Sequence, residues 1–344
     1  MSIEDMVKIA PKAELHVHIE GTMEPELLFE LAQKNNKCLN YTIEQCRDER
    51  KNQYNLKEFL IQYNDACKVL VSENDFYTIA IQYFTKAISH NVVYCEVFFD
   101  PQTYMANGVS FETIIKGLTK ASEEIKDQLQ AKWIMCFLRH LPEADCLELI
   151  NQAEPYAHLI HGIGLDSLEE GNPARKHENV FRIAEEKGLC GKKGTNKTAH
   201  AGEESDASNV ISSLYHLNVP RIDHGVRSLD CLNLCKALKQ SEVALTLCPL
   251  SNIKLKVKER FFPDTQVVKE LFNIGVRITI NSDRPEIFGG YINDNYLCAL
   301  EEFEEDERKF VLRQLLKNSF LASFMEEEEK VAFCAKVDEA LDRF

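Results

Sequence analysis

Short apolar runs alternate with longer amphipathic segments along most of this 344-residue chain. Eight runs rich in apolar and β-branched residues have the length of buried strands. They are residues 14–19, 92–99, 133–138, 160–165, 197–201, 221–224, 244–248 and 277–281. Strands that alternate with helices indicate βαβ units and a parallel sheet, and eight units favour a closed barrel over an open sheet. We therefore predict an α/β fold, a (β/α)8 TIM-type barrel.

The segments between the runs are typical of helices, and the connections differ in length. Helices are expected at residues 111–128, 144–152, 173–187, 206–216, 229–239 and 265–272. The longer connection after the first strand should hold extra helices, including 26–35 and 56–71, and the acidic C-terminal part from residue 297 should be helical. Because no low-complexity linker or further repeat interrupts this pattern, we predict a single domain over residues 1–344.

Composition excludes several classes of function. A net charge of −15 repels polyanions, so we expect no nucleic-acid partner. No stretch approaches membrane-spanning length, and residues 1–9 lack the apolar core of a signal peptide. The 12 cysteines have no regular disulfide spacing, which favours a reducing, cytoplasmic location. Composition leaves open whether the chain forms a homo-oligomer.

Two histidines separated by one residue, His16 and His18, lie at the end of the first run. Side chains two apart on a strand share a face, so both imidazoles can reach one metal ion. His200, His224 and Asp283 also lie at the C-terminal ends of predicted strands, where barrels of this type build their active sites. Imidazoles with a single carboxylate favour catalytic zinc, with iron and manganese as alternatives.

An acid near this cluster supplies a second chemical function. Glu203 follows His200 by three residues and should lie beside the metal without binding it. Burial would raise the pKa of its carboxyl, which suits a proton shuttle or a general acid. Water bound to such an ion loses a proton near neutral pH, and His224 should either orient that water or accept the proton. Six further histidines are expected to be structural or exposed: His90, His140, His158, His161, His177 and His216. Of these, His140 follows the third predicted strand and could border the site.

Six ordered motifs between residues 11 and 291 carry a family resemblance. They are 14–22 (ELHVHIEGT), 162–166 (GIGLD), 200–203 (HAGE), 221–225 (RIDHG), 248–252 (CPLSN) and 281–283 (NSD). With these motifs the chain resembles the adenosine/adenine deaminase family of metal-dependent amidohydrolases. The resemblance implies one zinc ion per chain, and its implied ligands are His16, His18, His200 and Asp283. It further implies that Glu203 protonates purine N1, that His224 assists the water, and that the Gly164 backbone N–H meets purine N3.

Within this family the resemblance leans to the adenine-specific branch. Adenosine-type members typically carry an aspartate that touches the ribose where this chain has Glu20. The extra methylene of Glu20 would bring its carboxylate into space that a ribose needs. Residues 98–102, 164–167 and 288–291 also resemble the adenine branch. The implied reaction is hydrolysis of adenine to hypoxanthine and ammonia in purine salvage, with a small purine base as the partner.

One residue departs from the family pattern. Members usually have a second aspartate, which accepts a hydrogen bond at purine N7, where this chain has Arg284. A guanidinium can only donate, so Arg284 either turns away to pair with Glu286 or donates to an unprotonated N7 or to an oxygen of a modified purine. Two alternatives therefore stay open: a deaminase of adenosine or of an N6- or C8-substituted adenine, and a non-catalytic purine-binding relative.

A nucleic-acid base deaminase is set aside. Residues 18–20 match its H-x-E element, but no P-C-x-x-C follows in the chain.

Overall fold

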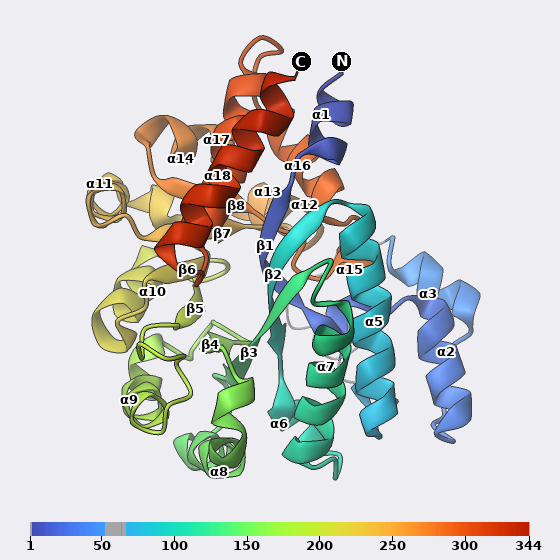
Figure 1. The fold of residues 1–344 in the computed structure, drawn as a ribbon. Coiled ribbons are helices and arrows are strands. Elements are labelled where there is room, and N and C mark those ends of the chain that lie inside the picture. The colour runs from blue at the N-terminus through green and yellow to red at the C-terminus, as the bar shows by residue number, and fades with distance from the viewer. Residues whose placement is uncertain (1, 52–62, 64–66, 344) are drawn as a thin grey trace.

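The strands lie at the centre of the molecule and the helices surround them (Figure 1). A computed structural model describes residues 2–51, 63 and 67–343. The strands are β1 (Lys12–His18), β2 (Val92–Phe99), β3 (Gln130–Leu138), β4 (Gly162–Asp166), β5 (Thr198–Ala201), β6 (Arg221–His224), β7 (Ala244–Leu247) and β8 (Arg277–Ile280). All eight predicted strands are therefore present. β3 begins three residues earlier than predicted, because Gln130, Ala131 and Lys132 also pair with β2 although two of these three residues are polar.

Two parallel four-stranded sheets, β1 to β4 and β5 to β8, are joined into a closed barrel. At one seam, the Ile163 N–H in β4 donates to the Asn196 carbonyl oxygen just before β5, at 3.0 Å. At the other seam, the His18 N–H donates to the Asp283 carbonyl oxygen at 2.8 Å, and the Asp283 N–H donates to the His16 carbonyl oxygen at 3.0 Å. The predicted (β/α)8 barrel is confirmed.

Extra helices precede and follow the first strand. They are α1 (Ile3–Ile9), η1 (Ile19–Thr22), α2 (Pro25–Lys34), α3 (Ile43–Glu49) and α5 (Glu73–Ser89). The predicted helix at 26–35 is α2, which begins with a proline at its first position, where a missing N–H costs nothing. Most of the predicted helix at 56–71 lies outside the described residues.

Helices follow each later strand on the outside of the barrel (Figure 1). Up to β6 they are α6 (Pro101–Met105), α7 (Phe111–Ile125), α8 (Glu143–Ala153), η2 (Glu154–Leu159), η3 (Ala174–His177), α9 (Glu178–Glu186), α10 (Ala207–Ser212) and η4 (Ser213–Leu217). After β6 they are η5 (Val226–Asp230), α11 (Leu232–Ser241), α12 (Pro249–Lys254), α13 (Val257–Phe261), α14 (Val267–Ile274), α15 (Pro285–Phe288), α16 (Ile292–Leu300), α17 (Arg308–Ala322) and α18 (Glu327–Asp342).

Three predicted helices differ from the observed elements because single residues leave helical backbone. The helix predicted at 173–187 is divided at His177, which has φ −112° and ψ 10°. The helix predicted at 206–216 ends in a π-helical turn before Asn218, which is left-handed with φ 51°. The helix predicted at 229–239 starts only at Leu232, because Cys231 is extended with φ −139°.

The C-terminal segment closes the floor of the barrel. α17 packs against β8 and β1, and α18 packs against α17 (Figure 1). Phe324, which follows α17, packs inside the barrel against Phe98, Ile134 and Cys136. Among the described residues, no helix is both long enough and apolar enough to cross a lipid bilayer.

A buried ion pair between Arg221 and Glu96 holds the C-terminal segment against this end of the barrel. The Arg221 guanidinium donates to Glu96 Oε2 at 2.6 Å, and both side chains are almost fully buried. Glu96 Oε1 also accepts from the Tyr94 hydroxyl at 2.8 Å and from the Phe324 N–H at 2.6 Å. The Arg221 guanidinium lies 4.3 Å from the centre of the Phe324 ring. Glu96 thus links two barrel strands to the C-terminal segment.

We predict that Glu96→Ala lowers the free energy of unfolding by about 3–5 kcal/mol, because Arg221 would stay buried without its nearest carboxylate. Chemical denaturation measures the change. The control is Glu112→Ala, which breaks an exposed pair with Lys116 on α7 and should leave the unfolding midpoint nearly unchanged. Equal effects of the two substitutions would contradict the role given to Glu96.

Candidate metal centre and active site

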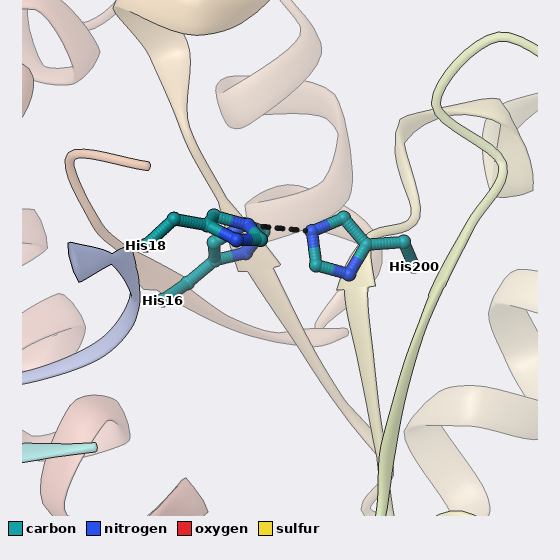
Figure 2. A group of neighbouring side chains, drawn as sticks. All are labelled: His16, His18 and His200. Carbon is teal, nitrogen blue, oxygen red and sulfur yellow. Dashed lines mark hydrogen bonds between the residues drawn. The ribbon is translucent and has the colours of Figure 1, made fainter. Parts of the chain in front are cut away.

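The residues predicted to hold a metal meet at one rim of the barrel. Figure 2 shows the rings of His16 and His18 beside that of His200, which comes from β5. His18 Nε2 and His200 Nε2 are 3.1 Å apart. Asp283 Oδ1 lies 3.7 Å from His16 Nε2 and 3.6 Å from His18 Nε2. The structure brings these four residues together from β1, from β5 and from the segment after β8.

These separations fit four ligands of one ion. Ligands placed about 2.0–2.1 Å from a tetrahedral zinc ion lie roughly 3.4 Å from one another. His16 Nε2 is buried and has no hydrogen-bond partner among the described residues. Burial lowers the pKa of both His16 and His18 well below the usual range, with neighbouring histidines and Arg284 adding to the effect. Both imidazoles are therefore neutral at neutral pH, the form that binds a metal.

A chain of hydrogen bonds sets the proton position on His16. The Thr246 hydroxyl donates to Asp223 Oδ1 at 3.0 Å, so it can only accept from His16 Nδ1, which lies 2.8 Å away. The proton of the neutral imidazole is then on Nδ1, and the Nε2 lone pair faces the other ligands. Hydrogen bonds of this kind to the second ring nitrogen orient metal-binding histidines.

A carboxylate also lies near the Nδ1 atom of each of the other two imidazoles, those of His18 and His200. Asp166 Oδ2 is 3.6 Å from His18 Nδ1, and Asp223 Oδ2 is 3.4 Å from His200 Nδ1. On the aspartate itself, the Ser251 hydroxyl donates to Asp283 Oδ2 at 2.6 Å. The sequence assigns no role to these supporting groups. Asp166, Asp223 and Thr246 are polar residues inside apolar strands, which is the signal that could have found them, whereas Ser251 lies in helix α12.

Two residues of the site have backbone conformations that non-glycine residues rarely adopt. His224 and Asp283 both have φ 61°. Such strain collects at functional sites when the surrounding structure enforces it. Here the barrel seam holds Asp283, and the Gly225 N–H donates to the Ala201 carbonyl oxygen at 3.0 Å directly after His224.

The predicted proton-transfer residues lie beside this cluster. His224 Nε2 is 3.5 Å from Glu203 Oε1 and 3.9 Å from Asp283 Oδ2. Burial lowers the pKa of His224 to about 4, so the ring is neutral at neutral pH. Burial also raises the pKa of Glu203 well above the usual range, and the nearby charges of Asp283 and Glu204 raise it further. A buried carboxyl group with a raised pKa and a neutral imidazole thus adjoin the candidate ligands.

Arg284 points into the site. The residue is 5% exposed, and Nη1 donates to Asp283 Oδ1 at 2.9 Å. Asp283 keeps the pKa of Arg284 above its usual value although burial opposes the charge. Gly21 makes room for this side chain, because a Cβ added there would lie 2.3 Å from Arg284 Cβ. The predicted alternative, in which Arg284 turns away to Glu286, is not the observed arrangement, and Glu286 accepts from the Tyr291 hydroxyl at 2.9 Å.

The remaining predicted residues lie around the same rim. Glu20 is buried and accepts a hydrogen bond from the Asp100 N–H at 2.8 Å. Burial, together with the charge of Asp100, raises the pKa of Glu20 to about 8. Gly164 lies within β4, where a Cβ would come 2.6 Å from Cys136 Sγ, so packing alone explains a glycine there. His140 is exposed and contacts Ser167 Oγ at 2.8 Å.

Comparison with known proteins places the chain in a family. The model of the family described as adenosine deaminase matches residues 11–340. The chain belongs to the adenosine deaminase family. An adenine deaminase from Psychrobacter cryohalolentis is 43% identical, over 98% of this chain and 99% of its own. One from Trichlorobacter lovleyi is 45% identical, over 96% of this chain and 92% of its own.

Solved structures agree with this placement. The crystal structure of an adenine deaminase from Arthrobacter aurescens matches with a TM-score of 0.88 and 35% identity, and the match covers 97% of this chain and 99% of that one. An amidohydrolase from Burkholderia ambifaria with bound zinc has a TM-score of 0.85 at 22% identity, over 99% of this chain and 93% of its own, and so supports the fold alone. As a member of the adenosine deaminase family, this protein is a hydrolase acting on C–N bonds and uses a divalent metal.

We predict that Asp223→Asn weakens metal binding by about 10- to 100-fold, because Asp223 supports both His16 and His200 from behind. Metal content after dialysis against graded chelator measures the change by mass spectrometry, without an activity assay. Asp127→Asn, at an exposed turn after α7, is the matched control and should retain metal like the unaltered protein. Identical chelator sensitivity of the two variants would contradict the role of Asp223.

Proposed function

We propose that this protein is a zinc-dependent adenine deaminase that hydrolyses adenine to hypoxanthine and ammonia. The observation that carries the proposal is the convergence of His16, His18, His200 and Asp283 beside a buried acid and a neutral imidazole. Relatives named adenine deaminase are 40–45% identical over nearly the whole chain, which supports adenine as the substrate.

Four residues would hold the metal, one ion per chain. They are His16, His18, His200 and Asp283, three imidazoles and one carboxylate, a donor set that favours zinc. When bound there, zinc supplies a water molecule that is activated as a nucleophile near neutral pH. The supporting hydrogen bonds of Thr246 and Ser251 would keep the ligand atoms in place for it.

The residues beside the metal ligands would move the protons. Glu203, kept protonated by burial, donates to purine N1 and makes C6 more electrophilic. His224 is neutral and can accept a proton from the attacking water or orient that water. Water adds at C6 and the amino group leaves as ammonia, so the balance is adenine plus water to hypoxanthine plus ammonia.

Glu20 supports a free base over a nucleoside. Its carboxyl group is fixed by the Asp100 N–H and has the length to occupy the space of a ribose. The Gly164 N–H contact with purine N3 stays a prediction. Twelve free cysteines fit a reducing compartment, and we propose a cytoplasmic, single-domain enzyme.

We predict that Glu203→Gln lowers kcat on adenine by about 10²- to 10⁴-fold with little change in KM, because the amide cannot supply the proton. Ammonia release measures the rate, and zinc content should equal that of the unaltered protein. A panel of adenine and adenosine should show turnover of the base alone. Unchanged kcat in this variant would contradict the role of Glu203, and no turnover of any aminopurine by the zinc-loaded protein would favour a non-catalytic purine-binding relative.

Buried Arg284 favours a second candidate, a deaminase of an N6- or C8-substituted adenine. Its guanidinium lies in the site and donates a hydrogen bond to Asp283 Oδ1, the oxygen that lies nearest His18 Nε2. A purine whose N7 is unprotonated, or one that carries an oxygen nearby, would suit a hydrogen-bond donor there.

We predict that Arg284→Asp raises kcat/KM for adenine relative to substituted adenines by roughly 10- to 100-fold, the effect of one hydrogen bond to a charged group. The carboxylate would accept from N7–H, which the guanidinium cannot do. Ammonia release from adenine and its N6- and C8-substituted forms measures the ratio. Arg182→Asp on the exposed face of α9 should change nothing. Unchanged kinetics of Arg284→Asp would remove any role of this position in specificity.

A further inference from the structure

A second buried glutamate, Glu169, lies behind the loop that carries Glu203. It follows β4 and is 2% exposed. Its two carboxylate oxygens accept from four consecutive backbone N–H groups and one side-chain amide. The donors are Gly202 N–H (2.6 Å), Glu203 N–H (3.1 Å), Glu204 N–H (3.0 Å), Ser205 N–H (3.0 Å) and Asn209 Nδ2 (3.0 Å). One carboxylate therefore satisfies every backbone donor of residues 202–205.

Four successive N–H groups reach one carboxylate only when the loop is bent back on itself. Gly202 supplies that bend with φ 66°, and a Cβ added there would lie 2.6 Å from Val210 Cγ2. From the other side, the Arg227 N–H donates to the Gly202 carbonyl oxygen at 2.9 Å. Hydrogen bonds to a charged acceptor are about twice as strong as neutral ones, so Glu169 fixes this loop conformation more firmly than a neutral side chain would.

The loop begins directly after β5 and brings the Glu203 carboxyl group to the candidate metal ligands. His200 is fixed by its strand, whereas Glu203 depends on the loop for its position. Glu203 Oε1 is 3.5 Å from His224 Nε2, so a small displacement of the loop would separate the acid from the reacting atoms. Misplacement of a catalytic group by about 1 Å is enough to cost about 10²-fold in rate.

We propose that Glu169 is a positioning residue that holds the 202–205 loop so that the Glu203 carboxyl faces the substrate, and that it acts on the reaction only through Glu203. The inference rests on the proposed function of Glu203 as proton donor. Among the residues that the structure describes, Glu169 forms no hydrogen bond with a candidate metal ligand or with His224; its donors are the N–H groups of residues 202–205 and the Asn209 amide.

Glu169→Gln removes the charge and places an amide N–H against backbone N–H groups. We expect kcat on adenine to fall about 10- to 100-fold with KM changed less than about 2-fold, because the proton donor is misplaced while the binding groups remain. Metal content should be unchanged. Glu170→Gln, the exposed neighbour, is the matched control and should keep full kcat and KM.

A double-mutant cycle separates positioning from a general structural effect. If Glu169 acts through Glu203, Glu169→Gln should lower kcat in the unaltered protein but change it less than about 3-fold in the Glu203→Gln background. An equal loss in both backgrounds would overturn the inference and leave the proposed function intact. Full activity of Glu203→Gln by itself would instead overturn the role of Glu203, and this inference with it.

A milder variant keeps the test decisive if Glu169→Gln does not fold. Asn209→Ala removes one of the five donors and leaves the four backbone contacts. It should lower kcat by a smaller factor, of about 3- to 10-fold, and this loss should again vanish in the Glu203→Gln background. A loss that persists there would overturn the inference.

Discussion

Two backbone hydrogen bonds between Asp283 and the His16–His18 segment both close the barrel and assemble the candidate metal centre. They bring the end of the chain's last strand to its first, across more than 260 residues of sequence. Because the backbone of Asp283 is bonded on both sides of Val17, its carboxylate is held beside two imidazoles that share one strand face. The ligand distances are thus a consequence of strand register rather than of flexible side chains, which is how a rigid scaffold preorganises a site.

A polar interior surrounds this seam, and carboxylates lie close to the imidazoles of His16, His18 and His200. Asp223 stands behind His200 directly and behind His16 through Thr246, while Asp166 stands behind His18. Buried charges are stable only when they are paired or hydrogen-bonded. The same requirement applies at the floor, where the Arg221–Glu96 pair joins the barrel to the C-terminal segment. Ionisable groups therefore lie at both ends of the barrel. Those at the rim form the candidate active site, and the Arg221–Glu96 pair at the other end stabilises the fold.

Glu203 and Arg284 lie at the same rim, but their surroundings have different effects on their charge. Glu203 is isolated from water and lies near other carboxylates, so its pKa is raised well above the usual range. Arg284 stays charged because Asp283 lies 2.9 Å away, and Gly21 leaves space for its side chain. The candidate metal ligands His16 and His18 lie beside the same carboxylate of Asp283. Under the proposed function, a substitution at Arg284 would alter substrate preference without replacing any of the candidate metal ligands.

The sequence by itself determined the strand alternation, the barrel and the residues gathered at its rim. His16, His18, His200, His224 and Asp283 could be found because each follows or ends an apolar run, and parallel strands present such ends at one face. The supporting residues could not be assigned this way. Glu169 and Asp223 act through partners far away in sequence, and polarity alone does not say which partner a buried carboxylate will meet. Helix ends at His177 and Asn218 were also beyond prediction, because local backbone angles depend on packing.

Only the tertiary structure decided which carboxylate the Arg284 side chain pairs with. A lone guanidinium beside two acids in the sequence, Asp283 and Glu286, has two plausible partners, and residue type does not choose between them. The fold chose Asp283 because Gly21 opens space on that side and Tyr291 hydrogen-bonds Glu286 on the other. Sequence fixes which groups are available, whereas the space around them, set by segments distant in the chain, determines which contacts form.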